Sequence, residues 1–312
     1  MQEKKLVILE SILGKFYRSG ISEYLFQCPK CEHHKRKLSI NIEKNVFKCW
    51  VCDWSGKNIY RIVRTYGSSA NRNNWRKFFG HVEIENFSDK LFGKKSDSTE
   101  ASISLPKEFI SLANKDLPAT SVYALNYLFS RGITKKEIIR WKIGYCSEGE
   151  YAGRVIIPSF DLRGKVNYFV ARSFAQDWKK YLNPPKSKNI VFNHLYVNFD
   201  EELILVEGVF DAIVAGPNSV PLLGSTLREN HILLHEIVKN DTPVYIALDP
   251  DANKKEMHII NMLMQHDIEV CKIDIPNGVD VADMGRESFT KRKHLAKAVN
   301  SNSYLTRAIQ NL

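Results

Sequence analysis

The chain has 312 residues, of which 44% are hydrophobic and 26% are charged, as in an ordinary soluble protein of about two domains. No apolar run approaches the roughly 18 residues of a membrane-spanning helix, which argues against an integral membrane protein. The helical spacing of Leu6, Leu9 and Leu13 behind a charged start differs from a signal peptide, so we expect a cytoplasmic protein.

The net charge of +10 is concentrated in the first quarter of the chain. Residues 1–80 contain sixteen Lys and Arg against six Asp and Glu, whereas the remaining residues carry 29 of each sign. A localised basic excess is typical of a module that binds a polyanion, because neutralised phosphates release their counterions. The alternative is an unspecialised basic surface.

The first strong motif is a pair of C-x-x-C sequences that are separated by seventeen residues. This spacing predicts a zinc ion held by four thiolates, because each pair can form one half of a tetrahedral site. The alternation of Leu38, Ile40 and Ile42 with polar residues predicts a hairpin between the pairs, and hence a zinc ribbon. The alternatives are two disulfides or two redox-active C-x-x-C motifs. No secretory context supports disulfides, and the tandem arrangement of the two pairs argues against redox motifs. The predicted zinc ligands are Cys28, Cys31, Cys49 and Cys52.

Other residues near these ligands have simpler expected roles. We expect His33 and His34 to be solvated, and Cys146 and Cys271 to be small buried side chains. The hairpin also combines cations with aromatic rings, which is what a protein that binds single-stranded nucleic acid needs. Burial in a small core is the alternative for each ring. The cations are Lys35, Arg36, Lys37, Lys44 and Lys48, and the aromatic residues are Phe47, Trp50 and Trp54.

A helix is expected from Gly56 to Tyr66, followed by a small, polar linker over residues 67–104. Beyond it we predict a helix from Ser121, a second helix capped by Thr134, and a β-hairpin over residues 154–171. Cations gather on this hairpin and after it. As a set they predict a surface for a triphosphate and a template backbone, although each alone could simply face water. They are Arg154, Arg163, Lys165, Arg172, Lys179, Lys180, Lys186 and Lys188.

Three short apolar runs, over residues 203–206, 244–248 and 270–275, are predicted to be buried parallel strands that end in acids. Helices are expected between them, over residues 227–238 and 253–266. Because carboxylates at one edge of a sheet repel one another, a divalent cation is the expected solution, and oxygen ligands favour Mg²⁺. The acids are Glu207, Asp211, Asp249, Asp251, Asp280 and Asp283.

Two motifs among these acids, Glu207-Gly-Val-Phe-Asp211 and Asp249-Pro-Asp251, resemble the E-G-x-x-D and D-x-D signature of the Toprim domain. Bacterial and phage primases, topoisomerases and some nucleases share this domain. The paired cysteines resemble the primase zinc ribbon, and the segment from Arg154 to Lys180-Tyr-Leu-Asn183 resembles the basic subdomain of the primase polymerase core. The resemblance covers roughly residues 24–66 and 121–285, in the order that the family has.

This resemblance implies an α/β chain, α+β overall, in which an RNA polymerase core follows the zinc ribbon. The implied domains are a four-cysteine zinc ribbon over 1–66, a linker over 67–104, a basic N-terminal subdomain of the polymerase core over 105–200, a Toprim parallel-sheet domain over 201–285 and a C-terminal helical tail over 286–312.

The implied function is that of a DNA primase, a nucleotidyltransferase that makes short RNA primers from NTPs on single-stranded DNA. Glu207, Asp249 and Asp251 would hold catalytic Mg²⁺ or Mn²⁺, and the other acids, Asp211, Asp280 and Asp283, would support them. The zinc ion would be structural. The implied nucleotide and template contacts are Arg154, Arg172, Lys180, Tyr181 and Asn183.

The chain also departs from the family pattern. Cys31 stands where many primases have His, and the stretch from Phe192 to Leu195 lacks a lysine, which leaves open whether Lys186 or Lys188 replaces it. No G-x-x-x-x-G-K-[ST] motif is present and the tail is short, which favours a phage or plasmid enzyme with a separate replicative helicase and a single-stranded DNA-binding protein. The alternatives are a non-catalytic DNA-binding or recombination-mediator protein, or a Toprim nuclease or topoisomerase.

Overall fold

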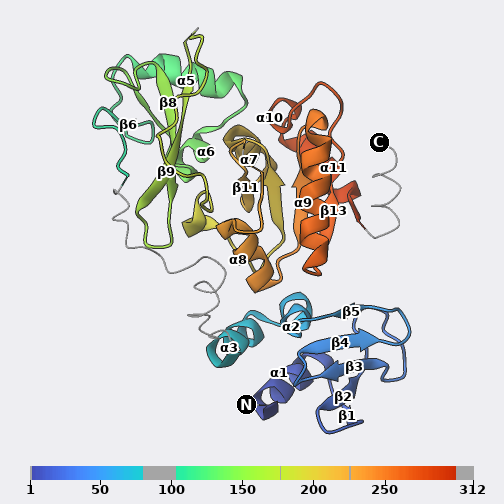
Figure 1. The fold of residues 1–312 in the computed structure, drawn as a ribbon. Helices are drawn as coiled ribbons and strands as arrows, with labels where there is room; N and C mark the ends of the chain where they lie inside the picture. Colours follow the sequence, from blue (N-terminus) through green and yellow to red (C-terminus); the bar gives the residue numbers. More distant parts are fainter. Residues whose placement is uncertain (1, 80–102, 176, 225, 300–312) are drawn as a thin grey trace. The chain divides into compact units, whose positions relative to one another are not determined.

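The computed structural model describes residues 2–79, 103–175, 177–224 and 226–299. The chain divides into two compact units, Met1–Asp97 and Ser98–Leu312 (Figure 1). Each unit has a hydrophobic core of its own. Within the described ranges, no helix is both long and apolar enough to cross a membrane.

The first unit is built on an antiparallel sheet with the strand order β1-β2-β3-β4-β5. The predicted hairpin is confirmed as β3 and β4, in which Leu38 pairs with Cys49 and Asn41 with Val46. Leu38 and Ile40 lie on one face of β3 and are fully buried, as the period of two along a strand predicts. The strands are β1 (Tyr17–Arg18), β2 (Glu23–Phe26), β3 (Leu38–Asn41), β4 (Val46–Cys49) and β5 (Ser55–Gly56).

Helix α2 (Tyr60–Tyr66) begins later than the predicted start at Gly56, because Ser55 and Gly56 pair with β4 instead. A Cβ atom added to Gly56 would come within 2.7 Å of a ring carbon of Phe47, so the close approach of these two strands requires glycine.

The range predicted as a linker contains helix α3 (Ser69–Phe79). Trp75 of this helix is buried in the core of the first unit, beside Tyr60 and Phe79, and α3 contacts helix α1 (Gln2–Leu13). Residues 69–79 therefore extend the zinc-ribbon unit. Their polar composition concealed this, since one large ring is enough to anchor a short helix. The predicted linker residues 80–102 lie outside the described part of the chain.

In the second unit, a segment of antiparallel strands and helices precedes a parallel sheet. An antiparallel sheet of order β6-β7-β8-β9 contains the predicted hairpin, and two helices pack beside it. Thr134 caps the second helix as predicted, in a reciprocal capping box with Glu137. The elements are α5 (Ser121–Ser130), α6 (Lys135–Arg140), β6 (Ile110–Ser111), β7 (Gly144–Cys146), β8 (Arg154–Phe160) and β9 (Val166–Ser173).

The predicted apolar runs form the parallel strands of the other sheet, whose order is β11-β10-β12-β13-β14. The chain leaves β10 toward β11 on one side and returns to β12 on the other, which creates a switch point at the carboxyl end of β10. The strands are β10 (Leu203–Val206), β11 (Ser219–Pro221), β12 (Val244–Ala247), β13 (Val270–Lys272) and the antiparallel edge β14 (Lys297–Ala298).

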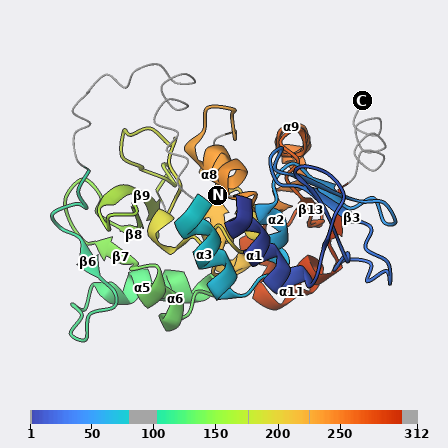
Figure 2. The ribbon, with the colours of Figure 1, turned by 90° about the horizontal axis from the view of Figure 1, so that it is seen from below.

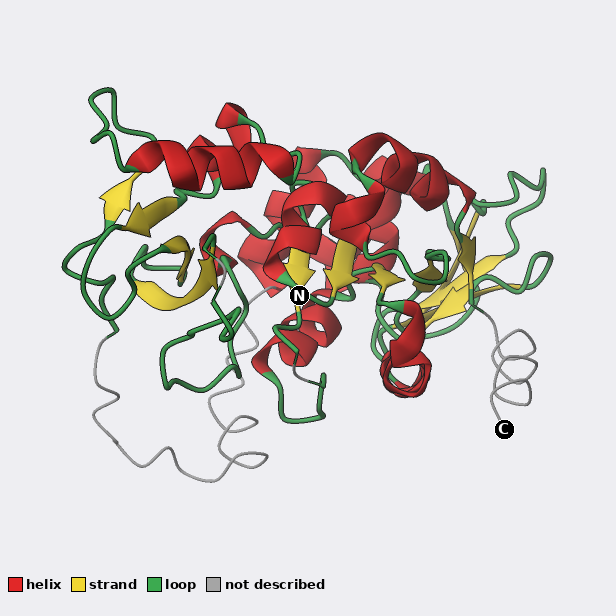
Figure 3. Ribbon diagram, turned by 90° about the horizontal axis from the view of Figure 1, so that it is seen from above, coloured by secondary structure: helices red, strands yellow, loops and turns green. Residues whose placement is uncertain are grey.

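Helices lie on both sides of this sheet. Figure 2 shows α9 and α11 on opposite sides of β13, and Figure 3 shows the central strands between the helices. Helix α8 begins at Ile232, after the capping residue His231, rather than at the predicted Leu227. The helices are α7 (Val209–Ala215), α8 (Ile232–Asn240), α9 (Asn253–Gln265), α10 (Val281–Met284) and α11 (Arg286–Leu295).

The segment predicted as a helical tail is helical only in α11 among its described residues. Phe289 of α11 is buried in the core of the parallel sheet, and β14 then pairs with β13. Residues 286–299 thus complete the sheet rather than extend from it. The rest of the predicted tail, residues 300–312, lies outside the described part of the chain.

Candidate functional site

The four cysteines of the ribbon converge as predicted. Their sulfur atoms lie within 4.8 Å of one another, and among the described residues no other group of three or more His, Cys, Asp or Glu comes together in this way. The Sγ–Sγ distance is 3.9 Å both for Cys28 and Cys52 and for Cys31 and Cys49. Zinc with Zn–S bonds of about 2.3 Å places its sulfurs ~3.8 Å apart, whereas a disulfide needs about 2.05 Å. The geometry fits a zinc ion, and His33 and His34 lie outside the ligand set.

Both halves of the zinc site share a local design. The residue after the second cysteine of each pair, Glu32 or Asp53, has a left-handed backbone, with φ of 50° and 55° respectively. Burial raises the pKa of Cys49, but backbone N–H groups of Cys52 and Val51 outweigh it, with help from neighbouring thiols, and lower this pKa to about 7. Burial, by contrast, raises the pKa of Cys28 to about 12 and also raises the pKa of Cys52, so the thiolate forms of these two ligands depend on the positive charge of a bound metal.

The aromatic residues of the ribbon divide between core and surface. Phe47 and Trp54 pack against each other in the core, so burial is their role. Trp50 is 65% exposed, and the Lys48 ammonium lies 4.9 Å from the centre of its ring. An exposed ring beside a cation is a suitable surface for an unstacked base.

In the second unit, acids line an open hollow of about 470 Å³ at the carboxyl end of the parallel sheet. We call this hollow the acidic cleft. Asp249 follows β12, and its Oδ1 atom is buried without a hydrogen-bond partner among the described residues. Burial and the charges of Glu207, Asp280 and Asp251 raise the pKa of Asp249 to about 6. The lining residues are Asp249, Pro250, Asp251, Asn277, Gly278, Val279 and Asp280.

Glu207 stands at the tip of β10, as predicted, and has a partner that the sequence did not indicate. Its Oε1 atom accepts a hydrogen bond of 2.9 Å from Nζ of Lys255, in the first turn of α9. A lysine on a polar helix normally faces water, so only the tertiary structure brings this one to the strand tip.

Asp211 lies within α7 and connects two loops of the site. Its side chain is buried, and its two oxygens accept hydrogen bonds of 2.9 Å from the N–H of Gly208 and from the N–H of Ala282. Burial outweighs these donors and raises the pKa of Asp211 to about 7. Asp211 therefore ties the turn after Glu207 to the start of α10, which carries Asp280.

Replacing Asp211 by Asn should loosen this tie, because an amide presents one acceptor and places its NH₂ group against the second N–H donor. We expect a loss of about 1–3 kcal/mol in the free energy of unfolding. Hydrogen exchange should become faster at the amides of Gly208 and Ala282. The exposed Asp116→Asn is the matched control. Unchanged exchange at both amides in Asp211→Asn would contradict this role.

Asp283 separates from the other acids. It lines a different hollow of about 540 Å³, together with Arg131, Gly132 and Arg286. The N–H of Asp283 donates a hydrogen bond to Oδ1 of Asp280, the residue that caps α10. The two residues therefore lie at the same end of this helix, but their side chains line different hollows. Its supporting role in the metal site remains a prediction.

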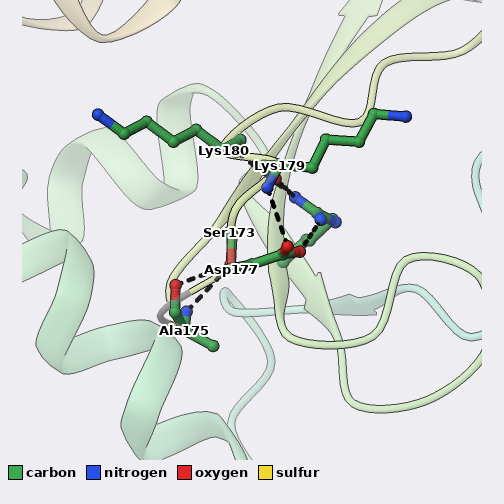
Figure 4. A network of polar contacts seen from close by, with 6 residues as sticks. Ser173, Ala175, Asp177, Lys179 and Lys180 are labelled. Atoms are coloured by element: carbon green, nitrogen blue, oxygen red, sulfur yellow. Dashed lines mark hydrogen bonds and ion pairs between the residues drawn. The ribbon is translucent and has the colours of Figure 1, made fainter.

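Arg154, predicted to contact nucleotide, lies inside the second unit. Its side chain is 5% exposed, and its guanidinium forms an ion pair with Asp177 and donates hydrogen bonds of 2.9 and 3.4 Å to the carbonyls of Lys179 and Lys180. Figure 4 shows this network, from which the side chains of Lys179 and Lys180 extend away in opposite directions. Arg154 therefore positions the segment that carries exposed lysines, and its phosphate contact stays a prediction.

Replacing either partner of the Arg154–Asp177 ion pair should lower the free energy of unfolding, but by unequal amounts. Asp177→Asn leaves a buried guanidinium without its counter-charge and should cost roughly 3–5 kcal/mol. Arg154→Met leaves the Asp177 carboxylate, which is 32% exposed and can be solvated, so we expect a smaller loss. Urea unfolding of both variants and of the double variant measures the coupling. The exposed Arg163→Met is the control, and equal losses at both ends would argue against this asymmetry.

The other predicted contacts lie on one edge of the same sheet. Arg172 donates from Nε to the hydroxyl of Tyr127 at 3.1 Å, and its guanidinium lies 4.6 Å from the ring centre of Tyr181. Oδ1 of Asn183 accepts a hydrogen bond from the N–H of Ala171 and fixes this segment to β9. Lys180 is exposed. Contacts of Arg172, Lys180, Tyr181 and Asn183 with nucleotide or template remain predictions.

No protein-family model matches the chain. It is 24% identical to the DNA primase of Clostridium acetobutylicum, over 96% of this chain and 58% of that protein. It is 26% identical to the DNA primase of Rickettsia felis, over 86% and 53%, and 26% identical to that of Aquifex aeolicus, over 91% and 64%. The chain thus spans between about half and two thirds of the length of these relatives.

Solved primase structures share the fold. The zinc-binding and RNA polymerase domains of the Aquifex aeolicus primase match 94% of this chain and 83% of that one, with a TM-score of 0.50 and 21% identity. A primase catalytic domain bound to single-stranded DNA matches 62% of this chain and 76% of that one, with a TM-score of 0.53 and 19% identity. The chain is thus similar in sequence to bacterial DNA primases, and its fold matches the zinc-binding and RNA polymerase domains of one of them.

Proposed function

We propose that the chain synthesises short RNA primers from NTPs on a single-stranded DNA template. The observation that carries this proposal is the acidic cleft, where Asp249, Asp251 and Asp280 gather at the carboxyl end of a parallel sheet and one Asp249 oxygen lacks a partner among the described residues. The DNA primases that resemble the chain over most of its length support the same activity.

The donor set of the cleft fits a hard divalent cation, because it consists of carboxylates without thiol or imidazole groups. Glu207, Asp249 and Asp251 would hold Mg²⁺ or Mn²⁺, which stabilises charge on the reacting phosphates when bound. Asp280 also lines the cleft and adds negative charge there. Asp211 holds the two loops at their spacing, as its paired hydrogen bonds indicate.

The chain's cations would bind the substrates. Arg172 and Lys180 would neutralise the triphosphate of the NTP or the template backbone and orient the α-phosphate for attack by a 3′-hydroxyl, with pyrophosphate as the leaving group. The ribbon, with its basic excess and exposed Trp50, would bind the unpaired template.

From the resemblance of the motifs we also propose that the parallel sheet is a Toprim domain and that the protein acts in the cytoplasm with a separate replicative helicase and a single-stranded DNA-binding protein. The same resemblance supports a phage or plasmid origin. The predicted division of the polymerase core near residue 200 is also part of this proposal.

A direct assay incubates the purified chain with labelled NTPs, Mg²⁺ or Mn²⁺ and mixed-sequence single-stranded DNA. We expect short RNA products that require all the templated nucleotides. A parallel reaction with end-labelled DNA tests for a nuclease. Cleaved DNA without RNA, or no RNA on any template even with the cognate helicase, would overturn the proposal.

A further inference from the structure

Lys255 occupies a position that no predicted function explains. Its ammonium lies 2.9 Å from Oε1 of Glu207, and the two side chains are only 18% and 29% exposed. One cation therefore pairs with a residue expected to hold a divalent metal ion.

The fold fixes this lysine in place. The turn Asp249-Pro250-Asp251 leads directly into α9, so Lys255 projects from the first turn of the helix toward the tip of β10. The next residue, Glu256, is buried and forms an ion pair with Lys272 of β13, which holds the helix against the sheet. Lys254, one position earlier, is exposed. The packing of α9 thus directs Lys255 toward Glu207.

A carboxylate oxygen that accepts from an ammonium is poorly placed to bind a divalent cation at the same time. The two positive charges would repel each other at contact distance, and the low exposure of the pair limits screening by water. Binding of metal would then require the ammonium to leave Glu207. The side chain of lysine is long and flexible enough to swing to another anion nearby.

We propose that Lys255 is a positioning residue of the cleft: its ammonium holds Glu207 until a divalent cation binds, and then turns to the phosphates of the incoming NTP. Only the second half of this inference, the turn of the ammonium toward the NTP phosphates, rests on the proposed function. The first half concerns metal binding alone and can be measured without NTP, template or catalysis.

The test compares Lys255→Met with Lys255→Arg and with the exposed control Lys254→Met. Binding of Mn²⁺, followed by electron paramagnetic resonance without nucleotide, should become about tenfold tighter in Lys255→Met, because the competing charge is gone. Lys255→Arg should stay near the parent, since it keeps the charge, and so should Lys254→Met.

Primer synthesis should move in the opposite direction. For Lys255→Met we expect a KM for NTP raised about tenfold or more at saturating metal, with the variant folded. Tighter metal binding together with weaker nucleotide use separates this role from a structural one, which would weaken both. Mn²⁺ binding that is unchanged or weaker in Lys255→Met would overturn the inference. If no variant or parent makes RNA, the proposed function fails while the metal measurement still decides the first half.

Discussion

Asp249→Ala is expected to reduce primer synthesis by at least about a thousandfold, because it removes a carboxylate that would hold the cation stabilising the reacting phosphates. The variant should remain folded. Asp249 is one of several acids around the cleft, and its buried oxygen has no hydrogen-bond partner among the described residues, so its removal also relieves repulsion. Unfolding should therefore occur at the same or a slightly higher urea concentration.

The measurement pairs RNA synthesis with Mn²⁺ binding and urea unfolding on the same preparations. Asp249→Asn keeps the size of the side chain and removes its charge, so it should lose activity almost as completely. The exposed Asp116→Asn should behave as the parent protein. A folded Asp249→Ala that makes primers at the parent rate would argue for a different catalytic centre.

Loss of zinc is expected to unfold the first unit while the second stays folded. The ribbon has a small core, and structural zinc in such sites contributes about 10–16 kcal/mol of apparent binding free energy that is coupled to folding. The second unit has a separate core, so it does not depend on the cysteines. Cys49→Ala, which removes a buried ligand at the end of β4, should release the metal and expose β3 and β4 to hydrogen exchange.

Zinc content and hydrogen exchange of the full chain distinguish the outcomes. Cys271→Ala, outside the ligand set, should retain one zinc ion per chain and full protection of the ribbon. Strong protection of β3 and β4 in zinc-free Cys49→Ala would show that the core alone holds the ribbon. Because we propose that this unit binds the template, the zinc-free variant should also bind single-stranded DNA more weakly, with a smaller dependence on salt.

The features best predicted from the sequence are those set by local spacing. The paired cysteines lie in two tight turns on a hairpin, so their spacing nearly fixes the ligand geometry. Strand tips are similarly local: an apolar run that ends in an acid places Glu207 and Asp249 at the sheet edge. The predicted ends of helices and domains were less accurate, because α2 and α8 begin later than predicted and Trp75 of α3 is buried within the predicted linker.

The direction in which a polar side chain faces was less predictable. Arg154 looks like one more cation of a basic hairpin, and Lys255 like a solvent-facing lysine, yet one is buried against Asp177 and the other contacts Glu207. Asp280 and Asp283 are three residues apart, but only Asp280 lines the acidic cleft. Such choices depend on which elements pack together.

The sequence by itself determined the zinc ligands, the parallel strands and the acids at their tips, because these follow from short-range spacing and from the burial of apolar runs. Only the tertiary structure decided which charges are paired. In the fold, Lys255 pairs with Glu207, Asp177 pairs with Arg154, and Asp211 accepts hydrogen bonds from two backbone N–H groups. The physical reason is that an ion pair forms between groups distant in the chain, at a cost of desolvation that only a particular packing can offset.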